Sequence, residues 1–248
     1  MDLLAGYGIV PVLVALLAAF GSAFVRGLTG FGMAILLVPI LALALAPVDA
    51  VLLANFLSLF IGLSQIGRLV RGAEKSAWTI IGLVALTTPA GLYLLSVTSP
   101  ALARVVIAGI ALSAFVAILL PRRGAREHHV ATTGGVGLLS GLMTGYAGMP
   151  GPPVVPYYVG RDIPREVAKA SMMLIFTCAS AVGLASGTAF GVLDWSLALL
   201  ALVLFPSVLL GNWLGDRASG RIEDRTWRIC VGLVLGGAAI GAVWKALA

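Results

Sequence analysis

The stretch YAGMPGPPVVPYY, residues Tyr146–Tyr158, places four prolines within thirteen residues, between two strongly apolar segments. Proline removes a backbone hydrogen-bond donor and clashes with the preceding turn of a helix. Lipid offers no partner for backbone groups that are left unpaired. The stretch is therefore not the middle of a simple membrane-spanning helix, and we predict that it is the tip of a helical hairpin.

The composition places the chain in a membrane. Its 248 residues are 60% hydrophobic and 10% charged, whereas a soluble domain has about 25% charged residues. The apolar runs are continuous over about 17 to 22 residues instead of alternating, which predicts helices and not a β-barrel. The net charge of +6 comes from basic residues between these runs, so the positive-inside rule explains it without a nucleic-acid partner.

Ten apolar segments follow one another, with short connections and no large soluble domain. Their approximate ranges are 9–25, 28–46, 50–70, 77–97, 101–120, 132–147, 150–160, 167–190, 194–215 and 226–247. Segment 150–160 is too short to cross a bilayer as a straight helix. We predict an all-α integral membrane protein.

Rare residue types repeat at one spacing along the chain. Pro39 and Pro156 are 117 residues apart. The same spacing separates Pro47 from Pro164, Trp78 from Trp195, and Pro89 from Pro206. We therefore expect two transmembrane repeats of about five segments each, at 1–120 and 132–248, joined by a cytoplasmic linker at 121–131.

An odd number of segments in each repeat predicts that the two repeats are inverted relative to each other. Four basic connections mark the cytoplasmic side, and they contain Arg68, Arg71 and Lys75; Arg122, Arg123 and Arg126; Arg161, Arg165 and Lys169; and Arg217, Arg221 and Arg225. Both termini then face outside the cytoplasmic (inner) membrane. Each repeat opens with a hairpin, either fully spanning or re-entrant, and the two tips meet near the midplane.

The tips also carry a family resemblance. The stretches GLTGFGMAILLVPIL, Gly27–Leu41, and GLMTGYAGMPGPPVVPYY, Gly141–Tyr158, resemble the paired glycine-rich motifs of the TauE/SafE family of sulfite and organosulfonate exporters. The resemblance extends over nearly the whole chain in architecture. It implies transport of small sulfur-containing anions, and it does not name one substrate or one direction.

Arg26 is the most informative residue of the first tip, VRGLTGFG, Val25–Gly32. A guanidinium in the bilayer interior costs at least a few kcal/mol and normally faces a cavity or a partner. Its planar set of donors suits carboxylate, sulfite or sulfonate oxygens. The alternative is an arginine that reaches the membrane surface because the hairpin spans fully. Backbone amides and one hydroxyl complete this candidate anion site, from Gly27, Thr29, Gly30, Phe31 and Gly32.

The second tip lacks an arginine, and its prolines have no amide hydrogen. The donors left are the amides of Gly148, Met149 and Gly151, while carbonyls that face the prolines are free to bind substrate or a coupling cation. We expect a donor-poor wall of the binding site. The further substrate-binding candidates are Thr144, Tyr146, Pro150, Asn55 and Ser171. For Tyr146 the alternative is anchoring at the membrane interface, and for Asn55 and Ser171 it is an interhelical hydrogen bond.

These features predict a secondary transporter of a small anion that works by alternating access and is coupled to H⁺ or Na⁺. The alternatives are a channel-like anion pore and a membrane scaffold subunit that transports nothing. We expect no enzyme, cofactor or metal site, because the only histidines, His128 and His129, lie in the central linker. Glycine-rich helix faces permit a homodimer, while the substrate, direction and coupling ion are left open.

Overall fold

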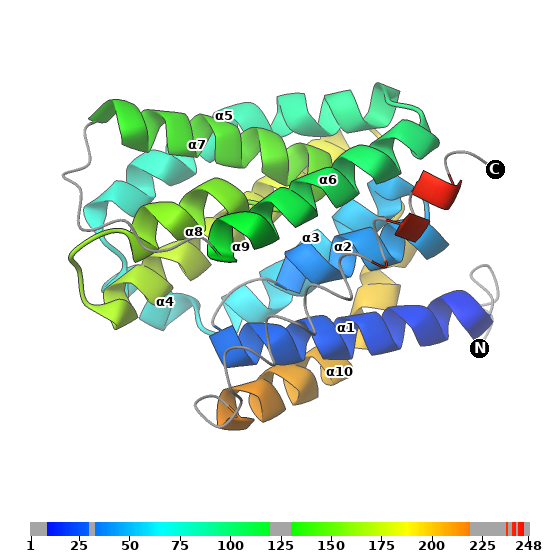
Figure 1. Cartoon of the computed structure of the whole chain (residues 1–248), viewed down its shortest axis with the longest axis horizontal. Helices are drawn as coiled ribbons and strands as arrows, with labels where there is room; N and C mark the ends of the chain where they lie inside the picture. Colours follow the sequence, from blue (N-terminus) through cyan, green and yellow to red (C-terminus); the bar gives the residue numbers. More distant parts are fainter. Residues whose placement is uncertain are drawn as a thin grey trace.

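The computed structural model describes residues 9–29, 33–119 and 130–218, together with 237, 240–241 and 243–245 near the C-terminus. Within these residues all regular structure is helical, which confirms the all-α prediction. The helices of the first half of the chain are α1 (Ile9–Thr29), α2 (Met33–Ala44), α3 (Pro47–Leu63), α4 (Ile66–Gly72), α5 (Lys75–Val97) and α6 (Pro100–Leu119). Those of the second are α7 (Val130–Ala147), α8 (Gly151–Val159), α9 (Arg165–Ala189) and α10 (Ser196–Ala218). Most of them run along the long axis of the molecule (Figure 1).

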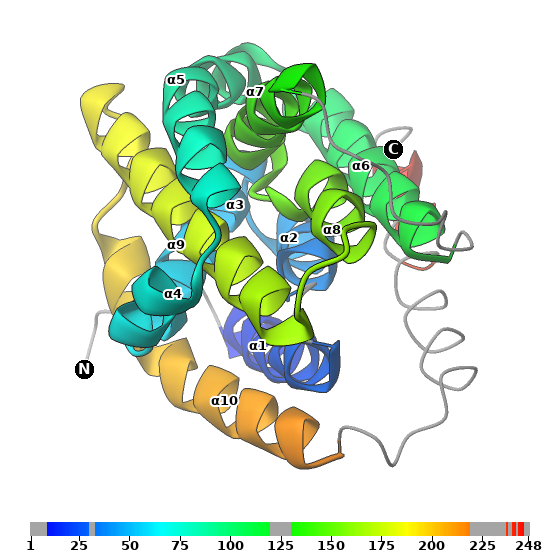
Figure 2. The same ribbon diagram turned by 90° about the vertical axis from the view of Figure 1, so that its left-hand side faces the viewer.

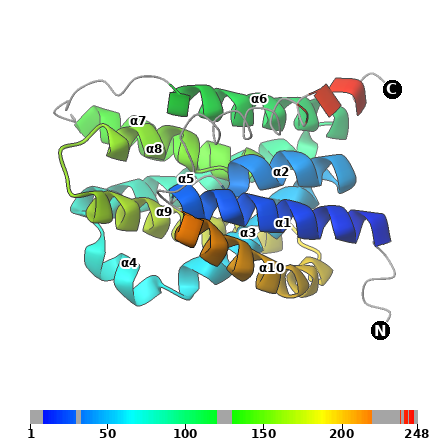
Figure 3. The same ribbon diagram turned by 60° about the horizontal axis from the view of Figure 1, so that its bottom comes forward.

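One expected segment differs from the structure. The run 50–70 is two helices, because α3 ends at Leu63 and α4 begins at Ile66 after a bend of 77°. Figure 3 shows α4 turned away from the axis of α3. The last expected segment, 226–247, lies mostly outside the described residues.

The prolines of the opening stretch begin a helix instead of breaking one. Pro152 and Pro153 lie in the first turn of α8, where a backbone amide has no helical partner to lose. Pro47 takes the same position in α3. Pro156 alone among the four prolines of the stretch lies inside α8.

The helix lengths suit a multi-pass membrane protein. Helices α5, α9 and α10 are each long and apolar enough to cross a membrane, and α3 with α4 passes as a bent fourth span. By contrast, α2 has 12 residues and α8 has 9, which at 1.5 Å per residue gives about 18 Å and about 14 Å. Neither crosses a hydrocarbon core of about 30 Å, so each opening hairpin pairs a long helix with a short one.

The long helix of each hairpin packs against a long helix from the other half of the chain. Helix α1 lies along α10, and α7 lies along α5, on opposite sides of the bundle in Figure 2. Glycines allow the backbones to touch. A Cβ added at Gly215 would strike the carbonyl oxygen of Phe24, and one added at Gly145 would strike that of Thr88. Such close contacts between small residues are how membrane helices gain packing energy without a hydrophobic driving force.

The centre of the bundle is filled by α2 and α3, which contact each other. Both helices are predominantly apolar and have no continuous polar face, as expected of helices without a solvent face. Leu37, Leu41, Leu52, Leu53 and Leu57 are fully buried there. Helix α3 also contacts α9, and this contact brings side chains from both halves of the chain to one place.

Candidate functional site

The tip of the second hairpin is a glycine-dependent helix cap. Helix α7 ends at Ala147, and Gly148 follows with φ of +66°, in the left-handed region that favours glycine. The Gly148 amide donates to the Thr144 carbonyl over 2.8 Å, and the Met149 amide donates to the Met143 carbonyl over 3.2 Å. The expectation that these two amides are free donors is therefore wrong, because the cap of α7 uses both.

A carbonyl of this tip is also occupied. The Ser140 hydroxyl donates to the Pro150 carbonyl over 2.8 Å, and Ser140 itself is fully buried. The expectation of free carbonyls is therefore wrong for Pro150. The tip of the second hairpin is therefore held by hydrogen bonds to its own helix α7.

A cavity lies where this tip meets the first turn of α2. Its volume is about 40 Å³, which is room for about three water molecules. Five of the predicted site residues line it, namely Arg26, Gly148, Met149, Pro150 and Gly151. The two hairpins therefore contribute to one cavity, as the sequence led us to expect.

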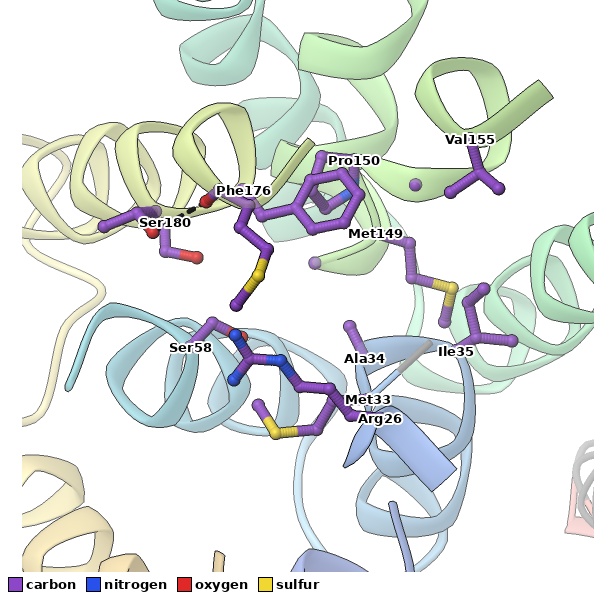
Figure 4. Close-up of a pocket in the computed structure, with 14 residues that line it drawn as sticks. Arg26, Met33, Ala34, Ile35, Ser58, Met149, Pro150, Val155, Phe176 and Ser180 are labelled. Carbon is purple, nitrogen blue, oxygen red and sulfur yellow. Dashed lines mark hydrogen bonds between the residues drawn. The ribbon is translucent and has the colours of Figure 1, made fainter. Parts of the chain in front are cut away.

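Arg26 brings the positive charge to this cavity from the last turn of α1. Its guanidinium extends toward Ser58, with Pro150 and Phe176 across the cavity (Figure 4). The Nη1 atom is buried and has no hydrogen-bond partner among the described residues. No described carboxylate forms an ion pair with Arg26 either. A buried charge without a partner costs several kcal/mol. An anion that entered the cavity would offset this cost by pairing with Arg26.

Sequence reasoning missed three polar residues of the cavity, Ser58, Thr177 and Ser180. Thr177 donates to the Met173 carbonyl over 2.8 Å. The hydroxyls of Ser58 and Ser180 make no hydrogen bond to any described residue. They lie on α3 and α9, so each half of the chain supplies one free hydroxyl. The missed apolar lining comes from Met33, Ala34, Ile35, Val155, Met173 and Phe176.

Several predicted residues are not among the lining residues. Gly27 lies inside α1 and packs against α10, where a Cβ would strike the Asn212 carbonyl. Thr144 is buried, and its hydroxyl donates to the Ser140 carbonyl over 2.7 Å. Tyr146 packs against the central apolar cluster. Their roles in the structure are helix packing and capping.

The remaining predicted residues either adjoin or belong to the part of the chain that is not described, or lie on helices beside the cavity. Thr29 ends α1, while its side chain and residues 30–32, Gly30, Phe31 and Gly32, lie outside the described part. Ser171 accepts a hydrogen bond of 2.8 Å from the Glu74 amide, so it joins α9 to the start of α5. This contact is the interhelical alternative that we considered.

Asn55 is a second buried polar group without a partner. It is 2% exposed, and its Nδ2 atom has no hydrogen-bond partner among the described residues. A Cβ added at Gly183 of α9 would lie 2.5 Å from this atom, so the amide fits into a notch that only glycine leaves open. Asn55 is one turn before Ser58 on α3, and it does not line the cavity.

A charged network fixes the base of the second hairpin, away from the cavity. Arg161 donates to the Glu74 carboxylate over 2.6 Å, to Ser76 over 3.1 Å and to the Tyr157 hydroxyl over 3.2 Å. Ser76 also bonds the Tyr158 hydroxyl over 2.9 Å. These contacts join the end of α8 to the start of α5, so the second hairpin is anchored at its base as well as at its tip.

Comparison with known proteins gives one result. The family model described as Sulfite exporter TauE/SafE matches residues 14–242. That span contains the tips of both hairpins and every residue of the cavity described above. No match was found among curated proteins or among solved structures.

Proposed function

Because the chain belongs to the TauE/SafE family of membrane exporters of sulfite and related sulfur compounds, we propose that it is a secondary transporter of a small sulfur oxyanion or organosulfonate. The substrate would bind in the cavity between the two hairpin tips. The proposal adds to the family assignment a binding residue, a substrate shape and a mechanism.

The single observation that carries the proposal is the buried Nη1 atom of Arg26 at the cavity, which has no hydrogen-bond partner among the described residues. An oxyanion would supply the missing counter-charge, and its oxygens match the planar donors of arginine. The hydroxyls of Ser58 and Ser180 are free to donate further hydrogen bonds. A volume of about 40 Å³ suits a compact oxyanion such as sulfite better than a sulfonate with a long organic chain.

The transport mechanism that we propose is alternating access of two inverted repeats. Its support is the reciprocal packing of α1 on α10 and of α7 on α5. The repeated prolines take equivalent places, with Pro89 inside α5 and Pro206 inside α10. Short helices α2 and α8 hold corresponding positions beside the cavity, as in transporters whose sites are formed by discontinuous helices. In this arrangement both termini face outside, and H⁺ or Na⁺ drives the cycle.

The test is ligand-induced stabilisation of the purified protein. We expect one class among sulfite, sulfate, thiosulfate, sulfonates and carboxylates to raise the Tm, because a ligand that binds only the folded state stabilises it. The Arg26→Gln variant should lose this shift. Arg104→Gln is the matched control, since Arg104 bonds the Ala42 carbonyl over 2.7 Å and does not line the cavity. An undiminished shift in Arg26→Gln would remove Arg26 from the site.

A further inference from the structure

A second, larger cavity lies between α4 and the first turns of α9. Its volume is about 230 Å³. The cavity forms because the chain bends by 77° between α3 and α4, and α4 then contacts α9. A Cβ added at Gly72 would lie 3.1 Å from the Cβ of Ala170, which shows how closely the far end of α4 approaches α9. Figure 2 looks onto this end of the molecule, with α4 beside α9.

The mostly apolar wall of this second cavity carries charged side chains with a net positive charge. Arg68 and Lys169 line it together with one carboxylate, Glu166, and with the amide of Gln65. No ion pair joins these charged side chains to each other or to any other described residue. Arg68 and Glu166 are exposed, so the charges attract an anion without holding it tightly.

Met173 separates the two cavities. Its side chain lines both of them, and it is only 8% exposed. Lys169, Met173 and Thr177 follow one another at intervals of four residues on α9, so they lie on one helical face. This face leads from the basic cavity to the Arg26 cavity over about 12 Å. Methionine has three rotatable bonds and an unbranched side chain, which suits a plug that has to move aside.

We propose that the cavity lined by Arg68 and Lys169 is a vestibule for the transported anion, and that Met173 is the gate between this vestibule and the Arg26 cavity. The inference rests on the proposed function for the identity of the ligand, a small hydrated oxyanion. The vestibule opens at the end of the molecule that the positive-inside rule predicts to be cytoplasmic. In the described conformation Met173 closes the passage.

Cysteine labelling tests the gate without requiring transport. Single cysteines are placed at Ala170, in the vestibule, and at Ser180, in the Arg26 cavity, after Cys178 and Cys230 have been replaced by Ala. The probe is the anionic reagent 2-sulfonatoethyl methanethiosulfonate, applied to the purified full-length protein. We expect Ala170→Cys to react rapidly and Ser180→Cys to react slowly.

Shortening the Met173 side chain should change the labelling rate of Ser180→Cys and not that of Ala170→Cys. Adding Met173→Ala should accelerate labelling of Ser180→Cys by about tenfold or more and leave Ala170→Cys unchanged, while Met173→Leu should keep the inner cysteine slow. If Met173→Ala does not fold, Met173→Val shortens the same side chain with less loss of packing. Equal labelling of the two cysteines with Met173 present, or no acceleration in the shortened variants, would overturn the gate.

The charge of the vestibule has its own measurement. In the Ala170→Cys protein, replacing Arg68 and Lys169 by Gln should slow the anionic reagent relative to neutral methyl methanethiosulfonate by at least about fivefold, which is the effect of a single one of the two lost unit charges at about 4 Å in water. An unchanged ratio of the two rates would overturn the anion vestibule.

The outcomes separate this inference from the proposed function. If Arg26→Gln keeps its ligand-induced stabilisation while the labelling pattern is as expected, the assignment of Arg26 fails and the gate stands. If the labelling pattern fails while Arg26→Gln loses that stabilisation, the gate fails and the Arg26 site stands.

Discussion

One arginine lies on the first hairpin and another lies just beyond the second, and the surroundings of these two arginines differ completely. Arg161, just beyond the second hairpin, has Glu74 at 2.6 Å and two hydroxyl partners. Arg26, on the first hairpin, has a buried Nη1 atom without any partner among the described residues. The second hairpin is also tied at its tip by the Ser140–Pro150 hydrogen bond. The difference separates an arginine that holds the fold together from one whose binding capacity remains unused.

The largest expected effect is on transport. Arg26→Gln should abolish it, because losing one partner of a buried charge pair costs about 2–5 kcal/mol of binding, or more than about 30-fold in affinity. Arg161→Gln should retain transport, since Arg161 does not line the cavity. The measurement is anion flux in proteoliposomes with equal amounts of each protein. Loss of flux in Arg161→Gln alone would reverse the roles assigned to the two arginines.

The next effect is on the free energy of unfolding, where we expect Arg161→Gln to be the more damaging variant and Arg26→Gln the less damaging one. Arg161→Gln should lower the free energy of unfolding by about 1–3 kcal/mol, because it leaves the Glu74 carboxylate without its charged partner. Arg26→Gln should not lower it, since the substitution removes a buried charge that lacks a partner. Thermal unfolding in detergent without added anions compares them. A larger loss in Arg26→Gln would show that Arg26 has a structural partner.

A smaller effect tests the cap at the second tip. Gly148→Ala should cost about 1–2 kcal/mol, because alanine is strained in the left-handed region and its Cβ would lie 3.3 Å from Val38. Gly134→Ala is the matched control on α7, where a Cβ would have nothing within 4 Å and alanine favours the helix. Thermal unfolding should show a lower Tm for the first variant only. Equal Tm values would mean that the tip does not depend on its left-handed glycine.

The smallest effect concerns a hydroxyl of the cavity. Ser180→Ala should weaken anion binding by about 0.5–1.5 kcal/mol, the net value of one hydrogen bond, with little change in stability. The control on the same helix is Ser186→Ala, whose hydroxyl already donates to the Val182 carbonyl over 2.7 Å. Titration of ligand-induced Tm shifts gives both affinities. Unchanged binding in Ser180→Ala would place the anion away from α9.

The parts of the fold that follow from local chemistry could be predicted. Apolar runs located the helices, and the prolines marked the start of α8 because proline acts on its own turn. The bend after α3 could not be predicted, since the glycines that flank it, Gly62 and Gly67, do not differ from glycines inside unbent helices such as Gly109. Packing of α4 against α9 accompanies the bend, and packing between distant segments is not a local property.

The candidate site shows the same limit. Arg26 could be found because an arginine between apolar runs is rare and expensive. Ser180 could not, because α9 carries small polar residues such as Ser171, Thr177 and Ser186 on several sides, and only tertiary packing decides which of them faces a cavity. Thr144 was predicted as a binding residue because it is polar, but its hydroxyl bonds to a carbonyl of its own helix. The Gly148 amide was misjudged because its partner depends on one backbone angle.

The pairing of α1 with α10 also governs the order in which the molecule can be built. Phe24 and Gly215, whose backbones touch, are 191 residues apart in the chain. At a synthesis rate of about 5–20 residues per second, α1 waits about 10–40 s for its partner. During that time its small-residue face has only lipid or the insertion machinery to cover it. Neither repeat, made alone, contains the partner of its own first helix, so a chain cut within 121–131 would assemble only when both pieces reach the same membrane.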